Sequence, residues 1–466
     1  MTIRLFDHYI HMSVVVLAII ELCVVLAALA LGNYVATEWL WIDGPKPGKF
    51  HQLSCAVTAV LVIFSMAAMG LYRIALRASY SGVIARVVVA VVLCGMFLPF
   101  LFYVIRPLYI PPEETFVAAG LAILGLAAVR YAFLKLVDES YFKRKVLVLG
   151  AGKRAAQFMT LRRLSDQRGF KINKFLWMEG DDPDVKLPDK RVRKLPDNLF
   201  EYARSRGIDE IVIAMDDRRG NLPVRELLEC RLASIDVTDV MNFLERETGK
   251  INLELVRPSW LIFESGFRRQ LPRRVAQRIF DVVASAVVLL PAAPLMLITS
   301  VLIKLEDKGP IFYRQRRVGQ NNVPFDVLKF RSMRTDAEAG GKAIWAQKDD
   351  DRVTRVGRVI RKIRIDELPQ LINVLRGEMS VVGPRPERPE FVDQLSEDLP
   401  YYLERHRVKP GITGWAQLCY PYGSSAKDAF EKLQYDLYYV KNRSLIFDFM
   451  ILLQTAEVVL WQKGAR

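Results

Sequence analysis

Four long apolar stretches constrain the fold of this chain more than any other feature of its sequence. They occupy residues 12–32, 53–72, 83–105 and 116–137. A helix rises 1.5 Å per residue, so about 20 apolar residues are needed to cross the hydrocarbon core of a bilayer. We therefore expect a bundle of four membrane-spanning helices within residues 1–140, followed by a longer and more polar remainder.

Charged residues in the connecting segments indicate how these helices are oriented. The link between the second and third stretches carries Arg73, Arg77 and Arg86, and basic residues also close the fourth stretch. Because basic loops stay in the cytoplasm, we expect both ends of the block, and everything after Lys143, to be cytoplasmic. Glu21 lies inside the first stretch, where a carboxylate either has a function or pairs with a polar group of the bundle.

Composition narrows the class of protein further. A chain of 466 residues predicts two to four domains, and its 52% of apolar residues, alongside 25% of charged ones, excludes general disorder. The net charge of +15 suits anionic lipid, phosphorylated small molecules or nucleic acid. The five cysteines lie far apart without a CxxC pair or an evident Cys/His cluster, so neither a disulfide framework nor a zinc site is expected.

A segment with a glycine turn follows the membrane block. Residues 145–155 have the pattern of a strand, a turn and a helix start, with Gly150 and Gly152 in a GxGxxA motif. A helical stretch at 200–206 and a strand-like run at 208–214 follow, so we expect a Rossmann-like α/β domain over residues 141–265. Gly150 and Gly152 indicate either a cofactor-binding turn or a purely structural one. The acidic candidates for holding a ribose, Asp166 and Asp181, do not clearly end a strand.

An oxidoreductase acting on nucleotide sugars is an alternative function. Such an enzyme would need a catalytic Tyr-xxx-Lys motif downstream of its glycine turn. That spacing occurs at Tyr131 and Lys135, which lie upstream of the turn and within a membrane stretch. This alternative therefore lacks an active site.

A fifth apolar stretch, residues 279–303, is flanked by basic residues on both sides. Positive charge at both ends favours keeping both ends in the cytoplasm. Pro291 and Pro294 lie in mid-stretch, where each removes a backbone donor, so a break and a reversal are expected. We predict a re-entrant membrane hairpin with its bend at these prolines. A kinked spanning helix is the alternative.

Residues suited to phosphate binding and catalysis follow this apolar stretch in the sequence. Lys329 and Arg331 share one face of an expected strand, where they suit a phosphate. Nucleic acid is not expected, because aromatic residues are not interleaved with the basic ones.

Since Pro369 is tolerated only in a first helical turn, we expect a helix to begin near Asp366, with Asp366 and Glu367 at its N-terminus. Two adjacent carboxylates can act as nucleophile and metal ligand, although capping is the ordinary role of such a pair.

Three further segments surround this acidic pair with rigid basic loops. Residues 383–387 present Arg385, whose planar guanidinium can bind a phosphate through two hydrogen bonds. Residues 409–417 present Lys409 between turn-forming residues, and residues 435–442 add Asp436. The set suits a phosphate-rich substrate with Mg²⁺.

The ordered motifs KFRSM, IDELPQLINVLRGEMSVVGPRP, KPGITGWAQ and YDLYYVKN, together with the interrupted apolar stretch, resemble a known family. Residues 268–466 are similar to the bacterial polyprenyl-phosphate sugar-1-phosphate transferases, the monotopic phosphoglycosyl transferases. The preceding helices and α/β domain resemble the large form of that family, typified by undecaprenyl-phosphate glucose phosphotransferases. The fold expected is thus a membrane protein of α plus α/β class: a transmembrane bundle (1–140), a Rossmann-like domain (141–265) and a cytosolic α+β catalytic domain (266–466).

The resemblance implies an activity and its residues. A sugar 1-phosphate, from a hexose such as glucose, would pass from a UDP-sugar to undecaprenyl phosphate with release of UMP. This reaction would start exopolysaccharide or other surface glycan assembly at the cytoplasmic face of the bacterial inner membrane. Asp366 would be the nucleophile that forms a covalent phosphosugar intermediate, Glu367 the Mg²⁺ ligand, and Pro294 the bend of the re-entrant helix. A homo-oligomer and a non-catalytic scaffold are left open.

Two positions depart from the family pattern. Ala293 precedes the proline where the family often has serine, which leaves the capping of the bend open. Residues 418–423 read LCYPYG where many members have an Asn-Gly-Arg stretch. The difference at residues 418–423 bears on which sugar the protein would select.

Overall fold

The computed structural model describes the chain in two compact units, Met1–Gly249 and Lys250–Arg466. It describes all residues except 1, 6–7, 40–49, 73–79, 137–142, 162–168, 186, 189–190, 220, 257–270, 336–351, 421–422, 424 and 462–466. The unit boundary lies nearer the N-terminus than the expected 265/266. Residues 250 and 251 belong to the second unit because Lys250 pairs with Glu431 and the Ile251 amide donates to the Gln434 carbonyl.

The first unit begins with a helical part. A small hairpin of β1 (Thr2–Leu5) and β2 (His8–His11) precedes four apolar helices, α1 (Met12–Tyr34), α2 (His51–Ala68), α3 (Tyr80–Val104) and α4 (Pro112–Leu136). A π-helical turn (Val35–Trp39) extends α1, and a 3-10 turn (Arg106–Leu108) precedes α4. Each of the four is long and apolar enough to cross a membrane, as expected from the sequence.

Buried polar groups hold one end of these helices together. Glu21 is fully buried, accepts a hydrogen bond from the Tyr72 hydroxyl (2.6 Å) and pairs with the Arg130 guanidinium (Nη2 to Oε2, 3.0 Å). Arg130 also donates to the Leu71 carbonyl and Arg86 to the Met69 carbonyl. A buried charge must be paired and hydrogen-bonded to be tolerated. Glu21 therefore has the structural role that was one of its two expected roles.

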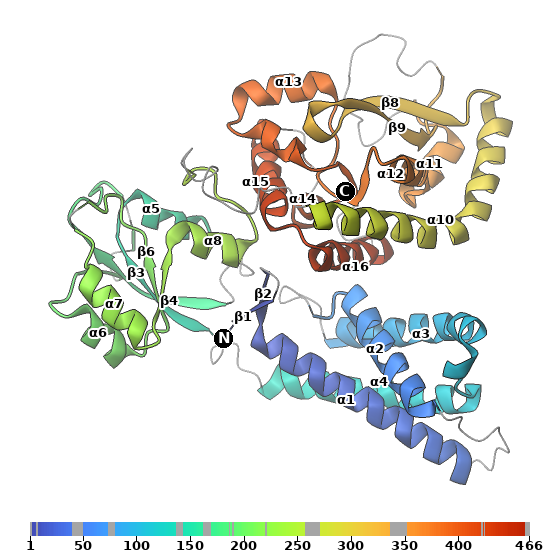
Figure 1. Cartoon of the computed structure of the whole chain (residues 1–466), viewed down its shortest axis with the longest axis horizontal. Helices are drawn as coiled ribbons and strands as arrows, with labels where there is room; N and C mark the ends of the chain where they lie inside the picture. The colour runs from blue at the N-terminus through green and yellow to red at the C-terminus, as the bar shows by residue number, and fades with distance from the viewer. Residues whose placement is uncertain are drawn as a thin grey trace. The chain divides into compact units, whose positions relative to one another are not determined.

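The remainder of the first unit is a five-stranded parallel sheet in the order β5-β4-β3-β6-β7. Its strands are β3 (Arg144–Leu149), β4 (Phe170–Trp177), β5 (Val192–Lys194), β6 (Glu210–Ile213) and β7 (Asp236–Asp239). Helices α6 (Leu199–Arg206) and α7 (Val224–Leu232) pack on one face, while α8 (Val240–Thr248) and the 3-10 turn Gln157–Thr160 pack on the other (Figure 1). The central strand β3 has fully buried residues on both faces, as expected of a parallel sheet.

The glycine turn of this sheet already holds an anion from the chain itself. A Cβ added at Gly152 would lie 1.9 Å from Oδ2 of Asp216, so only glycine admits this carboxylate. The Asp216 carboxylate accepts from the amides of Lys153 and Arg154, both at 2.8 Å. These amides open the single-turn helix α5 (Lys153–Ala156), where a dinucleotide phosphate would bind. An internal carboxylate therefore takes the donors that a phosphate would use, which favours the structural one of the two roles open to Gly150 and Gly152.

The two acidic residues considered for a ribose have other positions. Asp181 accepts from the amides of Ala151 (2.7 Å) and Met178 (2.9 Å), which fixes the loop after β4 to the glycine turn. Asp166 lies outside the described residues. The Tyr131 and Lys135 spacing lies within α4, where the ammonium stacks on the ring at 4.8 Å from its centroid.

The second unit combines two small sheets with helices. The antiparallel pair β8 (Phe312–Val318) and β9 (Pro324–Phe330) is joined by the turn Gln320–Asn322, and β10 (Ser380–Val382) pairs in parallel with β11 (Gly411–Thr413). The helices are α10 (Leu271–Asp307), α11 (Arg355–Lys362), α12 (Gln370–Arg376), α13 (Pro389–Asp398), α14 (Trp415–Cys419), α15 (Ala426–Asn442) and α16 (Leu445–Trp461). Two 3-10 turns, Ile365–Glu367 and Tyr402–Arg407, complete it.

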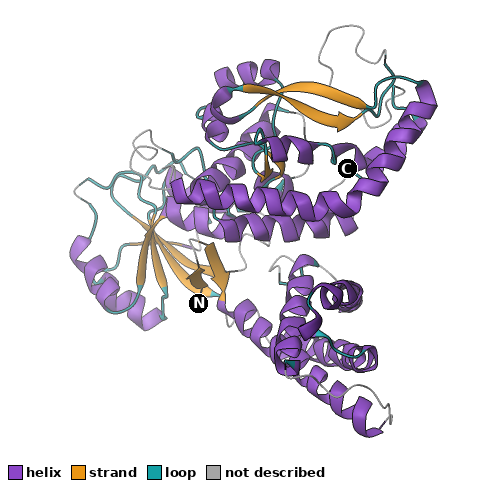
Figure 2. Cartoon of the chain, turned by 45° about the vertical axis from the view of Figure 1, so that its right-hand side comes forward, coloured by secondary structure: helices purple, strands orange, loops and turns teal. Residues whose placement is uncertain are grey.

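Helix α10 corrects one expectation. It is continuous through Pro291 and Pro294 rather than broken into a hairpin that reverses. Figures 1 and 2 show that the helix nevertheless changes direction along its length, so that its two arms meet at an angle. Each proline removes one helical hydrogen bond and crowds the preceding turn, which bends a helix without requiring that it end.

Both arms of α10 contact the same folded unit. In the first arm, Asp281 accepts from the Ser380 hydroxyl (2.8 Å) and the Val381 amide (3.0 Å). At the other end, Glu306 accepts from the Arg355 amide (2.8 Å), and Asp307 pairs with Arg331. The apolar side chains between these anchors are largely exposed, among them Val283, Val287, Leu290, Leu297, Ile298 and Val301.

Candidate active site

The acidic pair lies in a short 3-10 turn, Ile365–Glu367, which precedes α12. Arg364 enters this turn with a left-handed backbone (φ 62°), and Ile365 anchors it in an apolar cluster with Ile303, Phe330 and Ile360. Helix α12 begins at Gln370 with Pro369 as its N-cap, so the helix starts four residues later than Asp366, where it was expected. The carboxylates therefore precede the helix rather than forming its first turn.

Asn373 fixes α12 against the strand that carries Lys329. Its side chain is fully buried and forms hydrogen bonds with the outer edge of β9. It accepts from the Leu328 amide (3.0 Å) and donates to the Asp326 carbonyl (2.8 Å). It also donates to the Glu378 carboxylate (2.8 Å). These bonds satisfy a strand edge that would otherwise lack partners and set the distance between Lys329 and the acidic turn.

Three cations surround Glu367. Its carboxylate lies 3.0 Å from Arg385 Nη2, 3.6 Å from Lys329 Nζ and 3.7 Å from Arg364 Nη1. Burial by itself raises the pKa of this carboxyl, but Arg385, Lys329 and Arg364 outweigh burial and hold the pKa at about 2. Glu367 is therefore ionised at every physiological pH.

Asp366 has a different environment from its neighbour. Burial, and then the negative charge of Glu367, raise the pKa of Asp366 to about 6. Its Oδ1 is buried and has no hydrogen-bond partner among the described residues. A carboxylate of raised basicity with an unused oxygen is suited to nucleophilic attack.

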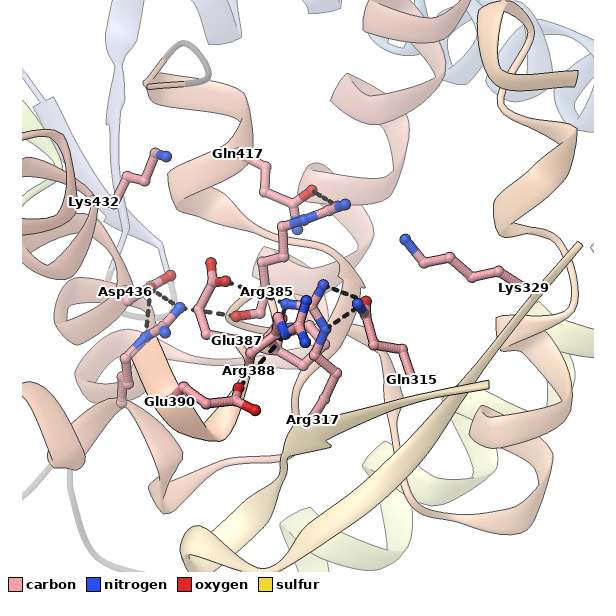
Figure 3. Close-up of polar contacts among 12 residues, drawn as sticks. Gln315, Arg317, Lys329, Arg385, Glu387, Arg388, Glu390, Gln417, Lys432 and Asp436 are labelled. Atoms are coloured by element: carbon pink, nitrogen blue, oxygen red, sulfur yellow. Dashed lines mark hydrogen bonds and ion pairs between the residues drawn. The ribbon is translucent and has the colours of Figure 1, made fainter. Parts of the chain in front are cut away.

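Arg385 is held by two glycine loops that pack backbone against backbone. A Cβ on Gly411 would lie 2.0 Å from the Gly383 amide nitrogen, and one on Gly414 would lie 2.2 Å from the Gly383 carbonyl oxygen. This explains the glycines of the GPRP and KPGITGWAQ motifs, because only glycine permits the approach. Gln417 of α14, which follows the second loop, accepts from Arg385 Nη1 at 3.4 Å (Figure 3).

Asp436 supports this loop from behind. It forms a buried pair with Arg405, which donates to Oδ2 through Nε (3.0 Å) and Nη2 (2.8 Å). Arg405 Nη2 also donates to the Arg385 carbonyl at 3.0 Å. Asp436 was expected to contact substrate or phosphate, and the structure shows one of its carboxylate oxygens, Oδ2, engaged in positioning the Arg385 loop.

Arg331 and Lys409, two other expected phosphate ligands, lie away from the acidic pair. The Arg331 guanidinium is buried and paired with Asp307 at the end of α10, so it is unavailable to a phosphate. Lys409 lies beside the C-terminal end of α12, where a Cβ added at Gly377 would be 3.5 Å from its ammonium. Of the four basic residues expected to bind phosphate, Lys329 and Arg385 are thus the two that contact the acidic pair.

A cleft of about 220 Å³ opens beside the Arg385 loop. Charged side chains from four segments line it, namely Glu387, Asp398, Arg405, Lys432 and Asp436. Figure 3 shows Glu387 between the arginines of its own loop and Lys432. Arg364, Arg405, Gln417 and Glu387 were not expected at the site, although the last two lie within or next to motifs already noted.

The donor set of the acidic pair can be tested against the Mg²⁺ that the sequence suggested. Mg²⁺ is bound by few protein carboxylates and completes its shell with phosphate oxygens and water. The unpartnered Oδ1 of Asp366 and the adjacent ionised Glu367 supply such oxygens. The residues therefore fit the ion, provided that Arg385 and Lys329 turn from Glu367 toward a bound phosphate.

Comparison with known proteins agrees with this geometry. The sequence pattern of the bacterial sugar transferase family matches residues 272–462. The chain is 44% identical over 245 residues to a UDP-N-acetylgalactosamine-undecaprenyl-phosphate N-acetylgalactosaminephosphotransferase of Aeromonas hydrophila, covering 52% of this chain and 56% of that protein. It is 36% identical over 330 residues to an undecaprenyl-phosphate glucose phosphotransferase of Komagataeibacter xylinus, covering 69% of this chain and 60% of that protein.

These matches span less than two thirds of the length of either relative. A third relative is covered more fully. It is a UDP-glucose:undecaprenyl-phosphate glucose-1-phosphate transferase of Caulobacter vibrioides, 43% identical over 191 residues that make up 41% of this chain and 71% of that protein. The chain therefore belongs to the bacterial sugar transferase family.

Proposed function

We propose that this protein transfers a sugar 1-phosphate from a UDP-sugar to undecaprenyl phosphate, with release of UMP. The observation that carries the proposal is the contrast within the acidic pair. Asp366 is more basic than an ordinary aspartate and has an unused oxygen, while Glu367 beside it is ionised among Arg385, Lys329 and Arg364. A diphosphate carries negative charge that this cationic surrounding can neutralise while Asp366 approaches phosphorus.

The reaction then proceeds in two balanced steps. A carboxylate oxygen of Asp366 attacks the sugar-bearing phosphorus, the bond between that phosphorus and the bridging oxygen breaks, and UMP leaves with the bond's electron pair. A phosphate oxygen of undecaprenyl phosphate next attacks the same phosphorus. The bond to Asp366 breaks, and the product is a polyprenyl diphosphate sugar. Splitting one displacement into two is the general gain of covalent catalysis.

The chain's own residues have separate tasks in these steps. Arg385 and Lys329 bind the phosphates and stabilise the charge that develops on the transferring group. Mg²⁺, when bound by Glu367, would supply Lewis-acid neutralisation of the diphosphate. Gln417 and the Arg405–Asp436 pair hold Arg385 in position. The polar cleft beside the Arg385 loop offers hydrogen-bonding groups to the hydroxyl-rich part of the donor.

The membrane arrangement follows from α10. Because both of its ends are bonded to one folded unit, we place both ends on the same, cytoplasmic face, with the exposed apolar middle in one leaflet. Cysteines introduced at Arg274 and Lys304 should then resist labelling from outside intact cells. Labelling of either position would overturn this placement.

The names of the relatives bear on the substrates. They name undecaprenyl phosphate as acceptor, with glucose in two cases and N-acetylgalactosamine in the third. We propose the same acceptor here and a hexose, such as glucose, as the sugar, in the first step of assembly of a surface glycan.

The activity is tested by radiolabel transfer from a panel of UDP-sugars into undecaprenyl phosphate, with UMP release measured in parallel. Asp366→Asn should abolish transfer while leaving thermal unfolding unchanged, and Glu390→Gln, which alters an exposed carboxylate, should leave transfer intact. Appreciable transfer by Asp366→Asn would remove Asp366 from its role. Failure with every UDP-sugar would contradict the proposed activity.

A further inference from the structure

Three side chains gather at one end of the apolar helices of the first unit. His51 and Cys55 lie one turn apart in α2, so they face the same side of that helix. Glu114 lies in the first turn of α4. One ligand atom from each of the three residues lies within 4.8 Å of the other two. We call this group the His51 cluster.

The distances within the His51 cluster match those between ligands of one metal ion. His51 Nε2 lies 3.6 Å from Cys55 Sγ and 3.3 Å from Glu114 Oε1. Zinc binds sulfur at about 2.3 Å and nitrogen or oxygen at about 2.0–2.2 Å, so a tetrahedral site separates nitrogen from sulfur by about 3.6 Å and nitrogen from oxygen by about 3.4 Å. The same imidazole nitrogen faces both partners, as it must if one ion is to contact all three.

An ordinary ion pair accounts less well for the cluster. Charge-assisted hydrogen bonds between nitrogen and a carboxylate are about 2.7–2.9 Å long, shorter than the 3.3 Å between His51 and Glu114. Glu114 is only 3% exposed, and its Oε1 has no hydrogen-bond partner in the part of the chain that the structure describes. A buried carboxylate oxygen without a hydrogen-bond donor is costly, and a bound cation removes that cost.

The helix ends around the cluster also favour its anionic ligands. His51 is the first residue of α2, and Glu114 is the third of α4, so both helices direct their positive N-terminal ends toward the group. Such ends stabilise a thiolate and a carboxylate. His51, Cys55 and Glu114 can therefore supply a neutral imidazole and two anions to a divalent ion.

We propose that the His51 cluster binds a divalent transition-metal ion of the zinc class, distinct from the Mg²⁺ suggested for the acidic pair. Nitrogen and sulfur ligands select zinc over magnesium, and three protein ligands leave a fourth position for water. The cysteine thiol loses its proton to solvent when the ion binds. The ion links the first turn of α4 to α2 and stabilises the helical part. This reverses the expectation from sequence that no zinc site is present.

The full-length protein in detergent, freed of any affinity tag and treated with a chelator, is titrated with Co²⁺ as a spectroscopic stand-in for zinc. A thiolate-to-cobalt charge-transfer band should appear, and Zn²⁺ should displace it. Cys55→Ser should abolish the band, and His51→Gln and Glu114→Gln should each weaken Co²⁺ binding at least tenfold. Cys94→Ser, a buried cysteine in α3, is the matched control and should keep the band.

The charge-transfer band reports a cysteine ligand, so Co²⁺ bound at Asp366 and Glu367 does not produce it. A wild-type protein that gives no such band, or a band that survives Cys55→Ser, overturns the proposal. If the variants fail to fold, wild type still decides the question. Zn²⁺ should protect Cys55 from maleimide and raise the midpoint of thermal unfolding, and the absence of both effects contradicts the site.

Discussion

Asn373 gives the sharpest test of how the fold positions the active site. Asn373→Asp preserves the size of the side chain and the oxygen that accepts from the Leu328 amide at 3.0 Å. It removes the amide that donates to the Asp326 carbonyl and to the Glu378 carboxylate, both at 2.8 Å. Asn373 is fully buried, so the carboxylate introduced there is also removed from water.

The magnitude follows from these two bonds. A neutral hydrogen bond contributes about 0.5–1.5 kcal/mol and one to a charged group about 1.5–3 kcal/mol, so the loss of both is about 2–4.5 kcal/mol. The second unit is of a size at which 1 kcal/mol shifts the unfolding midpoint by about 2–4 °C, so this loss predicts a fall of about 4–18 °C. Transfer activity should fall even below that temperature, because β9 carries Lys329.

Thermal unfolding in detergent measures the first effect, and sugar-phosphate transfer at a temperature where the variant stays folded measures the second. Asn198→Asp is the matched control. Asn198 caps α6 only through its side-chain oxygen, which aspartate retains, so that substitution should be nearly neutral. If Asn373→Asp lowers the midpoint no more than Asn198→Asp does, the reasoning about β9 and α12 is refuted.

Two further predictions concern Arg385 and His406. Arg385→Lys should lower transfer about ten- to a hundredfold, or about 1.4–2.7 kcal/mol, because lysine loses the planar contacts to Glu367 and Gln417. Arg388→Lys is the control, and equal losses in both variants would contradict the role of Arg385. Burial, and then the charge of Arg405, lower the pKa of His406 to about 3. Below pH 6.5 this histidine is therefore protonated in the unfolded chain but stays neutral in the folded chain. The free energy of unfolding therefore decreases as the pH falls, by about 2 kcal/mol at pH 5. In His406→Asn the unfolding midpoint should decrease less between pH 7 and pH 5 than it does in the wild type. An unchanged slope would show that His406 is not held neutral.

Sequence reasoning succeeded where residue type determines geometry. The apolar stretches give helices because their length and composition admit little else, and the glycines at 383, 411 and 414 mark a backbone approach that a Cβ would block. The acidic pair was recognisable because Pro369 sets the helix boundary close to it. Its exact start was missed, since Arg364 turns the chain in a left-handed conformation that its residue type does not signal.

Sequence reasoning failed where the outcome depends on contacts between distant residues. No residue near Gly152 indicates that the carboxylate of Asp216, more than sixty positions later, accepts hydrogen bonds from the amides of the glycine turn. Arg331 has the right type and spacing for a phosphate ligand, but the end of α10 supplies Asp307. Two prolines indicate a bend without distinguishing a kinked helix from a broken one. Glu114 joins His51 and Cys55 through helix packing that no local pattern encodes.

The proposed mechanism requires that Asp366 carry the sugar phosphate from donor to acceptor. Purified protein should be mixed with a UDP-sugar labelled in the phosphorus next to the sugar, without undecaprenyl phosphate, then quenched and mapped by peptide mass. We expect a burst of UMP equal in amount to the active protein, and a phosphosugar adduct on the peptide containing Asp366. Adding undecaprenyl phosphate should then remove this adduct. UMP release only after the acceptor is added, or an adduct on another residue, would contradict it.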